Sequence, residues 1–356
     1  MEKFDRVYIG TGPISVADAC HFASDDRNVL LVDDKARAGG AWVAIPIGEY
    51  GELEIGCHIW SYNKAVYDFL ERFFELDLIE LKPQPYFLRG NVKLGYDQKH
   101  AVTTLKSFGK RLSKGQVKSA FNYIRKDPSA RIPIIPKKYL YPRGGARDIQ
   151  QSIERKIETH RLITRLNSAV KSLRKIKENW ELTFDNGDQL LTKEVVMTAT
   201  SAIEGIEVDG QITNIEHTPI QYAHYHVVVK GKPKKPCSYV RVLNHDYIHR
   251  VSEITYQLEQ NNKEDLTVYI VGVFDHKLPS NKSEIEIAND LLTYLTDRGF
   301  TTQENTLLYQ QKNRFETTYI SGHQRALVNA MPGLELMATT DLIYGFYYQL
   351  EKWFKA

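Results

Sequence analysis

The sequence predicts an α/β fold that begins with a βαβ unit. Residues 6–10 form a short β-branched and aromatic run, which is typical of a buried strand. A glycine-containing stretch, residues 10–15, follows and leads into a helical pattern over residues 16–23. A second apolar run, residues 28–32, ends at Asp33. Strand, turn, helix and strand in this order are typical of a Rossmann-like domain.

The first turn has the properties that the pyrophosphate of a dinucleotide requires. Gly10 permits a sharp turn between strand and helix, and Gly12 lets the backbone approach a phosphate. The N–H groups at the start of the helix stabilise negative charge there. Asp33 lies 23 residues after Gly10, where a carboxylate can accept hydrogen bonds from a ribose diol. An ordinary βα turn is the alternative, but the acid in register favours a dinucleotide. The predicted contacts of this turn are Gly10, Gly12, Pro13, Ile14 and Ser15.

Ser15 stands where the G-x-G-x-x-G pattern has its third glycine. A serine is small enough to allow fairly close packing of the helix on the strand. Pro13 is suited to the first helical turn, because the N–H that proline lacks is not needed there.

A second pair of glycines follows Asp33, and a basic residue precedes the pair. An NAD site does not need these residues. In this spacing the sequence resembles the glutathione-reductase-like flavoproteins, in the branch that holds amine oxidases, protoporphyrinogen oxidase, phytoene desaturase and UDP-galactopyranose mutase. The resemblance implies FAD as the cofactor, with the glycine pair close to the flavin phosphates and ribityl chain. The residues that it implies for FAD in this stretch are Asp34, Arg37, Gly39, Gly40, Ala41 and Trp42.

The resemblance continues over about the first 200 residues. Residues 56–58 look like the family's G-x-H loop, which approaches the isoalloxazine, so His58 and Trp60 are implied near the flavin ring. His58 is expected either to act as a general base or to hydrogen-bond the flavin. Residues 141–150 look like the family's return to the FAD domain. Val170 stands where family members hold adenine through backbone groups.

The second half of the chain supplies fewer candidates. Arg250 lies in a segment similar to one in the mutase, where an arginine meets the diphosphate of the substrate. The alternative is an arginine that pairs with Glu253 on a sheet surface. At the C-terminus, Thr340 and Asp341 precede a predicted helix and stand where the family binds the flavin phosphate, although the family's usual glycine and arginine are missing there.

The resemblance implies a discontinuous FAD-binding domain interleaved with an α+β substrate domain. The predicted FAD domain comprises residues 1–75, 141–200 and 321–356, and the substrate domain comprises residues 76–140 and 201–320. Within these domains the patterns predict helices over residues 148–160, 283–298 and 342–354, a hairpin over 180–191, and strands over 195–199 and 267–273.

Residues 98–126 contain eight basic and no acidic residues. Lys106, Lys110, Lys114 and Lys118 recur every four residues, so a helix would place them on one face. Gly109 and Gly115 favour two short helices over one. The segment is expected to attract anionic lipid or a diphosphate-bearing substrate, or else to be a solvated face.

Composition limits the remaining possibilities. The chain has 356 residues, 42% hydrophobic and 26% charged, with a net charge of only +3, so it predicts a globular protein without a nucleic-acid partner. Its three cysteines lie far apart, which argues against disulfides or a metal site. The absence of a signal peptide and of a run of about 20 apolar residues predicts a cytoplasmic protein.

Three functions are consistent with the sequence. The first is an FAD-dependent oxidoreductase that takes a hydride from a small-molecule substrate. The second is a non-redox flavoenzyme that resembles the mutase and acts on a nucleotide sugar, with Arg250 on the diphosphate. The third is a binding protein that uses an altered flavoprotein fold.

Overall fold

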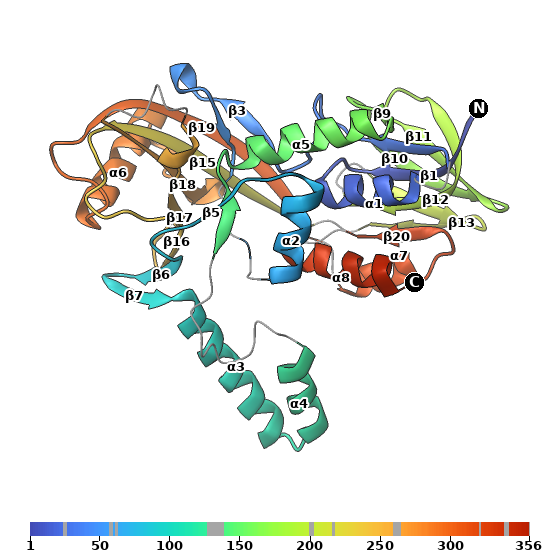
Figure 1. Ribbon diagram of the computed structural model, residues 1–356, viewed down its shortest axis with the longest axis horizontal. Coiled ribbons are helices and arrows are strands. Elements are labelled where there is room, and N and C mark those ends of the chain that lie inside the picture. Colours follow the sequence, from blue (N-terminus) through green and yellow to red (C-terminus); the bar gives the residue numbers. More distant parts are fainter. Residues whose placement is uncertain are drawn as a thin grey trace.

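The computed structural model describes residues 1–355 except 24–26, 57–59, 61–62, 127–138, 199–202, 216–217, 259–264, 320–321 and 338–341. Two large sheets lie along the longest axis of the molecule, and a pair of helices projects from one side (Figure 1). The predicted α/β class is confirmed.

The first sheet has nine strands in the order β14-β13-β10-β11-β12-β1-β2-β9, and β20 pairs with β12 outside this path. β1 (Glu2–Ile9) pairs in parallel with β2 (Val29–Val32) on one side and with β12 (Gln189–Met197) on the other. Their carboxyl ends therefore meet at one edge of the sheet, where α/β folds bind ligands. The other strands are β9 (Ile163–Arg165), β10 (Val170–Ile176), β11 (Asn179–Phe184), β13 (Gly205–Val208), β14 (Gln211–Asn214) and β20 (Leu334–Leu336).

Alternating side chains of β1 enter two separate cores. Tyr8 packs among the helices of one face, whereas Val7 and Ile9 pack on the other face with residues of β10–β12 and β20. The four helices of the first face are α1 (Pro13–Ala23), α2 (Lys64–Phe73), α5 (Ala146–Thr159) and α8 (Leu342–Lys355). A strand buried on both faces must be apolar throughout its central part, which explains the run that marked it in the sequence.

The second sheet has seven strands in the order β19-β15-β18-β17-β16-β6-β7. Helix α6 (Glu284–Asp297) covers one of its faces, and the hairpin of β3 (Ala44–Pro46) and β4 (Glu52–Glu54) covers part of the other. The strands are β6 (Tyr86–Arg89), β7 (Val92–Gly95), β15 (Thr218–Lys230), β16 (Val240–Leu243), β17 (Ile248–Glu253), β18 (Leu266–Phe274) and β19 (Thr306–Tyr319). The shorter elements are β5 (Leu78–Glu80), β8 (Leu140–Pro142), α7 (Gly322–Asn329), η1 (Gly48–Tyr50), η3 (Thr255–Gln257) and η5 (Asp275–Lys277).

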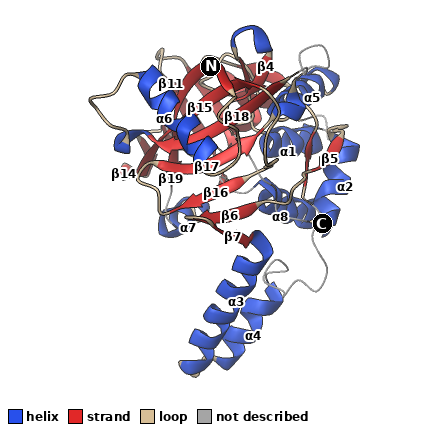
Figure 2. Cartoon of the chain, turned by 90° about the vertical axis from the view of Figure 1, so that its left-hand side faces the viewer, coloured by secondary structure: helices blue, strands red, loops and turns tan. Residues whose placement is uncertain are grey.

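The projecting helices are α3 (Tyr96–Ser113) and α4 (Val117–Lys126), which extend from β7 away from both sheets (Figure 2). Two helices were predicted here, and the structure has two. The helical conformation is interrupted only around Gly115, whose φ is +70°. Gly109 lies inside α3. In the described part of the chain, no helix has the length and apolar character needed to cross a bilayer.

Two details of the first sheet differ from the expectation. The predicted hairpin strand and the strand after it form one continuous strand, β12, because Thr192 between them is buried and its hydroxyl bonds the Glu194 carbonyl at 3.0 Å. The predicted domain boundary at residue 200 precedes β13 and β14, which extend the nine-stranded sheet.

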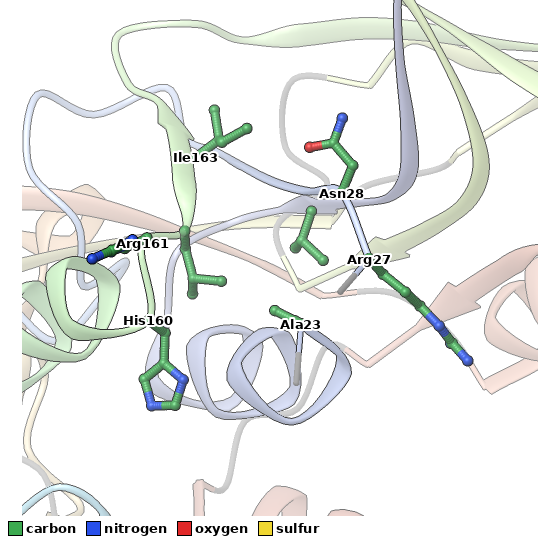
Figure 3. A pocket seen from close by; sticks show the side chains of 8 residues that line it. Ala23, Arg27, Asn28, His160, Arg161 and Ile163 are labelled. Carbon is green, nitrogen blue, oxygen red and sulfur yellow. The ribbon is translucent and has the colours of Figure 1, made fainter. Parts of the chain in front are cut away.

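An open cavity of about 340 Å³ lies at the amino ends of β2 and β9 (Figure 3). Arg27, His160 and Arg161 line it, together with Ile163. It lies at the edge of the sheet opposite to Asp33, so it is separate from the predicted dinucleotide site.

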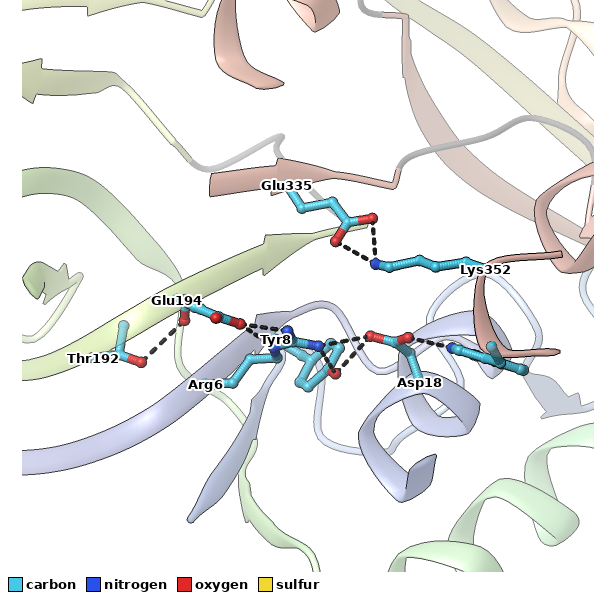
Figure 4. A network of polar contacts seen from close by, with 8 residues as sticks. Arg6, Tyr8, Asp18, Thr192, Glu194, Glu335 and Lys352 are labelled. Atoms are coloured by element: carbon cyan, nitrogen blue, oxygen red, sulfur yellow. Dashed lines mark hydrogen bonds and ion pairs between the residues drawn. The ribbon is translucent and has the colours of Figure 1, made fainter. Parts of the chain in front are cut away.

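A buried polar network joins β1, α1, β12 and α8 (Figure 4). Asp18 is 2% exposed and accepts hydrogen bonds from the Tyr8 hydroxyl at 2.7 Å and from Trp353 Nε1 at 2.8 Å. Arg6 lies 3.3 Å from the same carboxylate and also pairs with Glu194. The charge of Asp18 thereby fixes the last helix of the chain onto the first.

Candidate functional site

The glycine turn after β1 exposes its backbone. Gly10 has a φ of +105°, and its N–H donates to the Val32 carbonyl at 2.8 Å. Gly12 has open space where a Cβ would stand, with no atom within 4 Å. The Val16 N–H donates to the Gly12 carbonyl at 3.1 Å and begins the hydrogen bonding of α1. The turn therefore presents a bare backbone and a helix N-terminus to the same space, which is the arrangement that binds phosphate.

The second glycine pair lies against this turn. The Gly39 N–H donates to the Thr11 carbonyl at 3.2 Å and lies 3.1 Å from the Thr11 hydroxyl. Gly40 has a φ of +63°, and a Cβ on it would lie 3.4 Å from the Gly12 Cα. The positive φ favours glycine at position 40, and the two segments lie in van der Waals contact. The structure thus brings together two motifs that the sequence placed near one ligand.

Asp33 follows β2 and is 5% exposed. Its Oδ2 accepts from the Thr11 N–H at 2.8 Å and from the Thr11 hydroxyl at 2.6 Å, while Oδ1 accepts from the Lys35 N–H at 3.1 Å. Burial, and then the hydrogen bond with Asp33, raise the pKa of the neighbouring Asp34 carboxyl. Backbone N–H groups of Thr11 and Lys35 thus hold the Asp33 carboxylate in place at the end of β2.

Ser15 takes the place of a glycine at no loss of packing. It is fully buried, and its hydroxyl lies 2.8 Å from the Thr198 hydroxyl, just after β12. Thr198 in turn bonds the Ile9 carbonyl at 3.3 Å. Each buried hydroxyl therefore has a partner, so this departure from the motif does not disturb the turn.

The segment leading to Val170 runs beside Asp33. The Asn167 N–H donates to the Lys35 carbonyl at 3.0 Å, and the Ser168 N–H donates to the Asp33 carbonyl at 2.9 Å. Val170 is the first residue of β10 and is buried. This is the predicted adenine-side segment, and it adjoins the predicted ribose-side acid.

The residues on either side of the second glycine pair point in different directions. Arg37 is half-exposed and pairs with Glu154 at 3.2 Å and Glu52 at 3.5 Å, in the direction of α5. Ala41 is exposed, and the half-buried Trp42 ring lies 6.0 Å from the Trp60 ring.

Trp60 is 1% exposed and lies in an aromatic cluster. Its ring centroid is 5.2 Å from that of Tyr141 and 6.2 Å from that of Tyr67. Its Nε1 has no hydrogen-bond partner within the described residues. A buried indole N–H normally has a partner, so a ligand acceptor is a natural one here. His58, Thr340 and Asp341 lie outside the described residues.

Arg250 lies on the face of the second sheet that is turned toward this loop. Its Nη2 contacts His224 Nε2, and His224 Nδ1 lies 2.8 Å from the Ile55 carbonyl. Burial, and then the charge of Arg250, hold the pKa of His224 well below its usual range. Burial and Arg250 likewise lower the pKa of His249 to about 3. Arg250 is therefore the positive charge of this cluster, and the histidines beside it are neutral.

Glu253 is not the partner that the sequence alternative suggested for Arg250. The two residues stand three positions apart on β17, so their side chains point to opposite faces of the sheet. The Glu253 carboxylate accepts from the Cys237 N–H at 3.3 Å. Arg250 faces the side that the β3–β4 hairpin covers, and Glu253 faces the core beneath α6.

Glu54 is a buried carboxyl that sequence reasoning missed. Its Oε2 accepts from the Tyr141 hydroxyl at 2.8 Å and from the Ala146 N–H at 3.2 Å, at the start of α5. Its backbone carbonyl lies 2.8 Å from His226 Nε2. Burial raises the pKa of Glu54 to about 7. No sequence pattern distinguishes Glu54 from Glu52, which lies two residues earlier on the same strand and is partly exposed.

Comparison with known proteins identifies the fold. No protein-family model matches the sequence, and no curated protein matches it. Solved structures do match. A protein from Exiguobacterium sp. 255-15 that is assigned as a protoporphyrinogen oxidase has 14% identity and a TM-score of 0.66, over 100% of this chain and 99% of that one. The chain has the fold of the glutathione-reductase-like flavoproteins.

Two further structures in this flavoprotein fold are enzymes with different names. Reduced UDP-galactopyranose mutase has 13% identity and a TM-score of 0.63, over 94% of this chain and 88% of that one. Putrescine oxidase bound to putrescine has 13% identity and a TM-score of 0.61, over 94% and 93%. The predicted family resemblance is thus confirmed at the level of the fold.

Proposed function

We propose that the protein binds FAD at the edge of the nine-stranded sheet formed by the carboxyl ends of β1 and β2. The open backbone at Gly12 and the N-terminus of α1 fit a pyrophosphate. The fixed carboxylate of Asp33 fits a ribose hydroxyl, and the segment before Val170 fits adenine. Gly39, Gly40 and the orphaned Trp60 Nε1 continue this line toward the second sheet.

On this basis we propose an FAD-dependent oxidoreductase that acts on a small anionic substrate. Bound FAD supplies the hydride acceptor for a C–H bond beside an amine or alcohol, or between carbons, and dioxygen or another acceptor takes the electrons. The observation that carries the proposal is the contact of Arg250 with His224, which is anchored on the Ile55 carbonyl. This contact puts a positive charge from the second sheet beside the loop that leads to His58 and Trp60.

The residues of the second sheet would bind and orient the substrate. Arg250 would hold an anionic group, and His224, fixed through Nδ1, would keep the guanidinium in place. Trp42 and Trp60 would exclude water from one side. His58 is proposed as the group that moves a proton or hydrogen-bonds the cofactor.

Arg250 also favours a second candidate, a mutase-like reaction on a nucleotide sugar. A diphosphate is a better partner for a partly buried guanidinium than an amine substrate is. In this candidate the flavin would act without net oxidation. The two candidates share the FAD site and the anion contact, and differ in whether the substrate loses electrons.

An absorbance spectrum of the purified protein tests the cofactor. A flavin spectrum that is bleached by dithionite supports the proposal. Protein that is colourless as purified, and that takes up no FAD when it is added, removes both candidates and leaves a binding protein on this fold. Anaerobic reduction of the flavin by a substrate identifies the oxidoreductase, whereas turnover of UDP-sugars only after prior reduction identifies the mutase-like enzyme.

Substitution of Arg250 tests the anion contact. Arg250→Ala should raise KM for an anionic substrate about 10- to 100-fold, because a charge-assisted contact contributes about 1.5–3 kcal/mol. Arg241→Ala is the matched control, since Arg241 pairs with Arg250 in register on β16 and is exposed. An unchanged KM in the Arg250 variant, or an equal rise in both, contradicts the role of Arg250.

A further inference from the structure

The hairpin of α3 and α4 stands clear of the rest of the molecule (Figures 1 and 2). The two helices are held together by Phe108 and Phe121, whose rings lie 5.5 Å apart, and by a hydrogen bond of 2.8 Å from Arg111 to Ser119. The hairpin joins the body through β7. Because it projects in this way, its outer faces are free to contact a partner.

Apolar side chains of the hairpin remain exposed. Leu105 and Leu112, seven residues apart on α3, are 52% and 38% exposed. Val117 and Phe121, four residues apart on α4, are 54% and 61% exposed. Spacings of four and seven residues place each pair on one helix face. An apolar stripe is therefore exposed on each helix.

Lysines flank these stripes. Lys106 follows Leu105 on α3 and Lys118 follows Val117 on α4, whereas Lys110 lies farther round α3 from the stripe; all three are exposed. Residues 98–126 carry a charge of +8, whereas the whole chain carries +3, so the rest of the chain sums to −5. No ion pair with a carboxylate forms at these lysines in the part of the chain that the structure describes. The positive charge is thus concentrated on the projecting element.

We propose that the α3–α4 hairpin docks on a lipid bilayer that contains anionic head groups. Exposed leucine, valine and phenylalanine side chains would enter the boundary between head groups and acyl chains, and the lysines beside them would reach the phosphates. Charge decides in favour of this occupant, because residues 98–126, which make up all of the hairpin except its first two residues, contain no carboxylate and are complementary to an anionic surface. The apolar stripes favour a lipid surface over a nucleic acid, which would use the lysines alone.

Co-sedimentation of the full-length protein with vesicles tests the proposal. We expect binding to vesicles of phosphatidylcholine with 30% phosphatidylglycerol on the order of ten-fold or more above binding to phosphatidylcholine alone. The variant K106E/K110E/K114E/K118E should lose at least ten-fold in affinity, since each lysine near such a surface contributes about a five-fold factor. Equal binding of this variant would overturn the proposal.

Two further variants separate the alternatives. Reversal of four exposed lysines in the loop after β15, K230E/K232E/K234E/K235E, makes the same change in net charge elsewhere and should reduce binding much less. L105Q/L112Q keeps every charge and should weaken vesicle binding several-fold, with unchanged circular dichroism. An equal loss in the loop variant, or no loss in the leucine variant together with equal binding to an oligonucleotide, refutes a lipid-docking hairpin.

Discussion

Substitution of Gly12 by alanine separates folding from cofactor binding at one position. Gly12 is not among the residues with positive φ, and the space where its Cβ would stand has no atom within 4 Å. The folded chain therefore accepts the methyl group. The free energy of unfolding should stay the same or rise by about 0.4–1 kcal/mol, because alanine has less freedom than glycine in the unfolded chain.

The same methyl group should interfere with FAD. A phosphate oxygen that accepts from a backbone N–H of the turn lies about 2.9 Å from the nitrogen. The added methyl carbon would stand beside this hydrogen bond and keep the phosphate oxygen away. We expect Gly12→Ala to weaken FAD binding at least a hundred-fold, which corresponds to about 2.8 kcal/mol. Isothermal titration of the apoprotein with FAD measures the affinity, and thermal unfolding measures the stability.

Two other glycines provide the controls. Gly10 has a φ of +105°, so Gly10→Ala should lose about 1–3 kcal/mol of stability along with FAD binding. Gly109 lies in α3 with open space around its Cβ position, so Gly109→Ala should gain about 1 kcal/mol and bind FAD normally. Wild-type affinity in Gly12→Ala would refute the assignment of the turn to a pyrophosphate.

Three further predictions follow from buried polar groups. Ser15→Ala should lose about 0.5–1.5 kcal/mol of stability in urea unfolding, through the lost hydroxyl contact, and keep its FAD affinity; a larger loss of affinity than of stability would contradict this. The raised pKa of Glu54 means that its contribution to stability is complete below pH about 4.5 and is lost as pH rises through about 7, by about 3 kcal/mol. The stability difference between wild type and Glu54→Gln should therefore shift against the wild type from pH 5 to pH 8. Asp18→Ala should lose about 2–6 kcal/mol in urea unfolding, because the Tyr8 hydroxyl and Trp353 Nε1 both lose their acceptor, at about 1–3 kcal/mol for each unsatisfied group. A loss below about 1 kcal/mol would show that the network is dispensable.

The glycine turn after β1 was predictable because its signals are local. Gly10, Gly12 and Asp33 are fixed by one strand, one turn and the next strand, and their spacing alone specifies the geometry. The sequence also placed Gly39 and Gly40 near the same ligand, through the family resemblance. Both motifs occur within the first 40 residues, so few long-range contacts were needed to bring them together.

The cluster around Glu54 was not predictable, since it forms only through distant pairings. His224 reaches the Ile55 carbonyl because β15 pairs with β18 and the β3–β4 hairpin packs on that sheet, which joins residues 169 positions apart. The same packing brings His226 to the Glu54 carbonyl. No spacing in the sequence reports a contact between segments so far apart. Burial, rather than residue type, distinguishes Glu54 from Glu52.

The position of β20 has a consequence for how the protein is made. This strand pairs with β12 in the nine-stranded sheet, and α8 behind it supplies Trp353 to Asp18. A chain that ends at residue 330 therefore contains every strand of both large sheets except β20, and it lacks the helix that finishes the first sheet. Until translation passes Trp353, the apolar surface under α8 stays uncovered, so an early stop codon in this stretch should yield aggregation-prone fragments rather than a smaller folded protein.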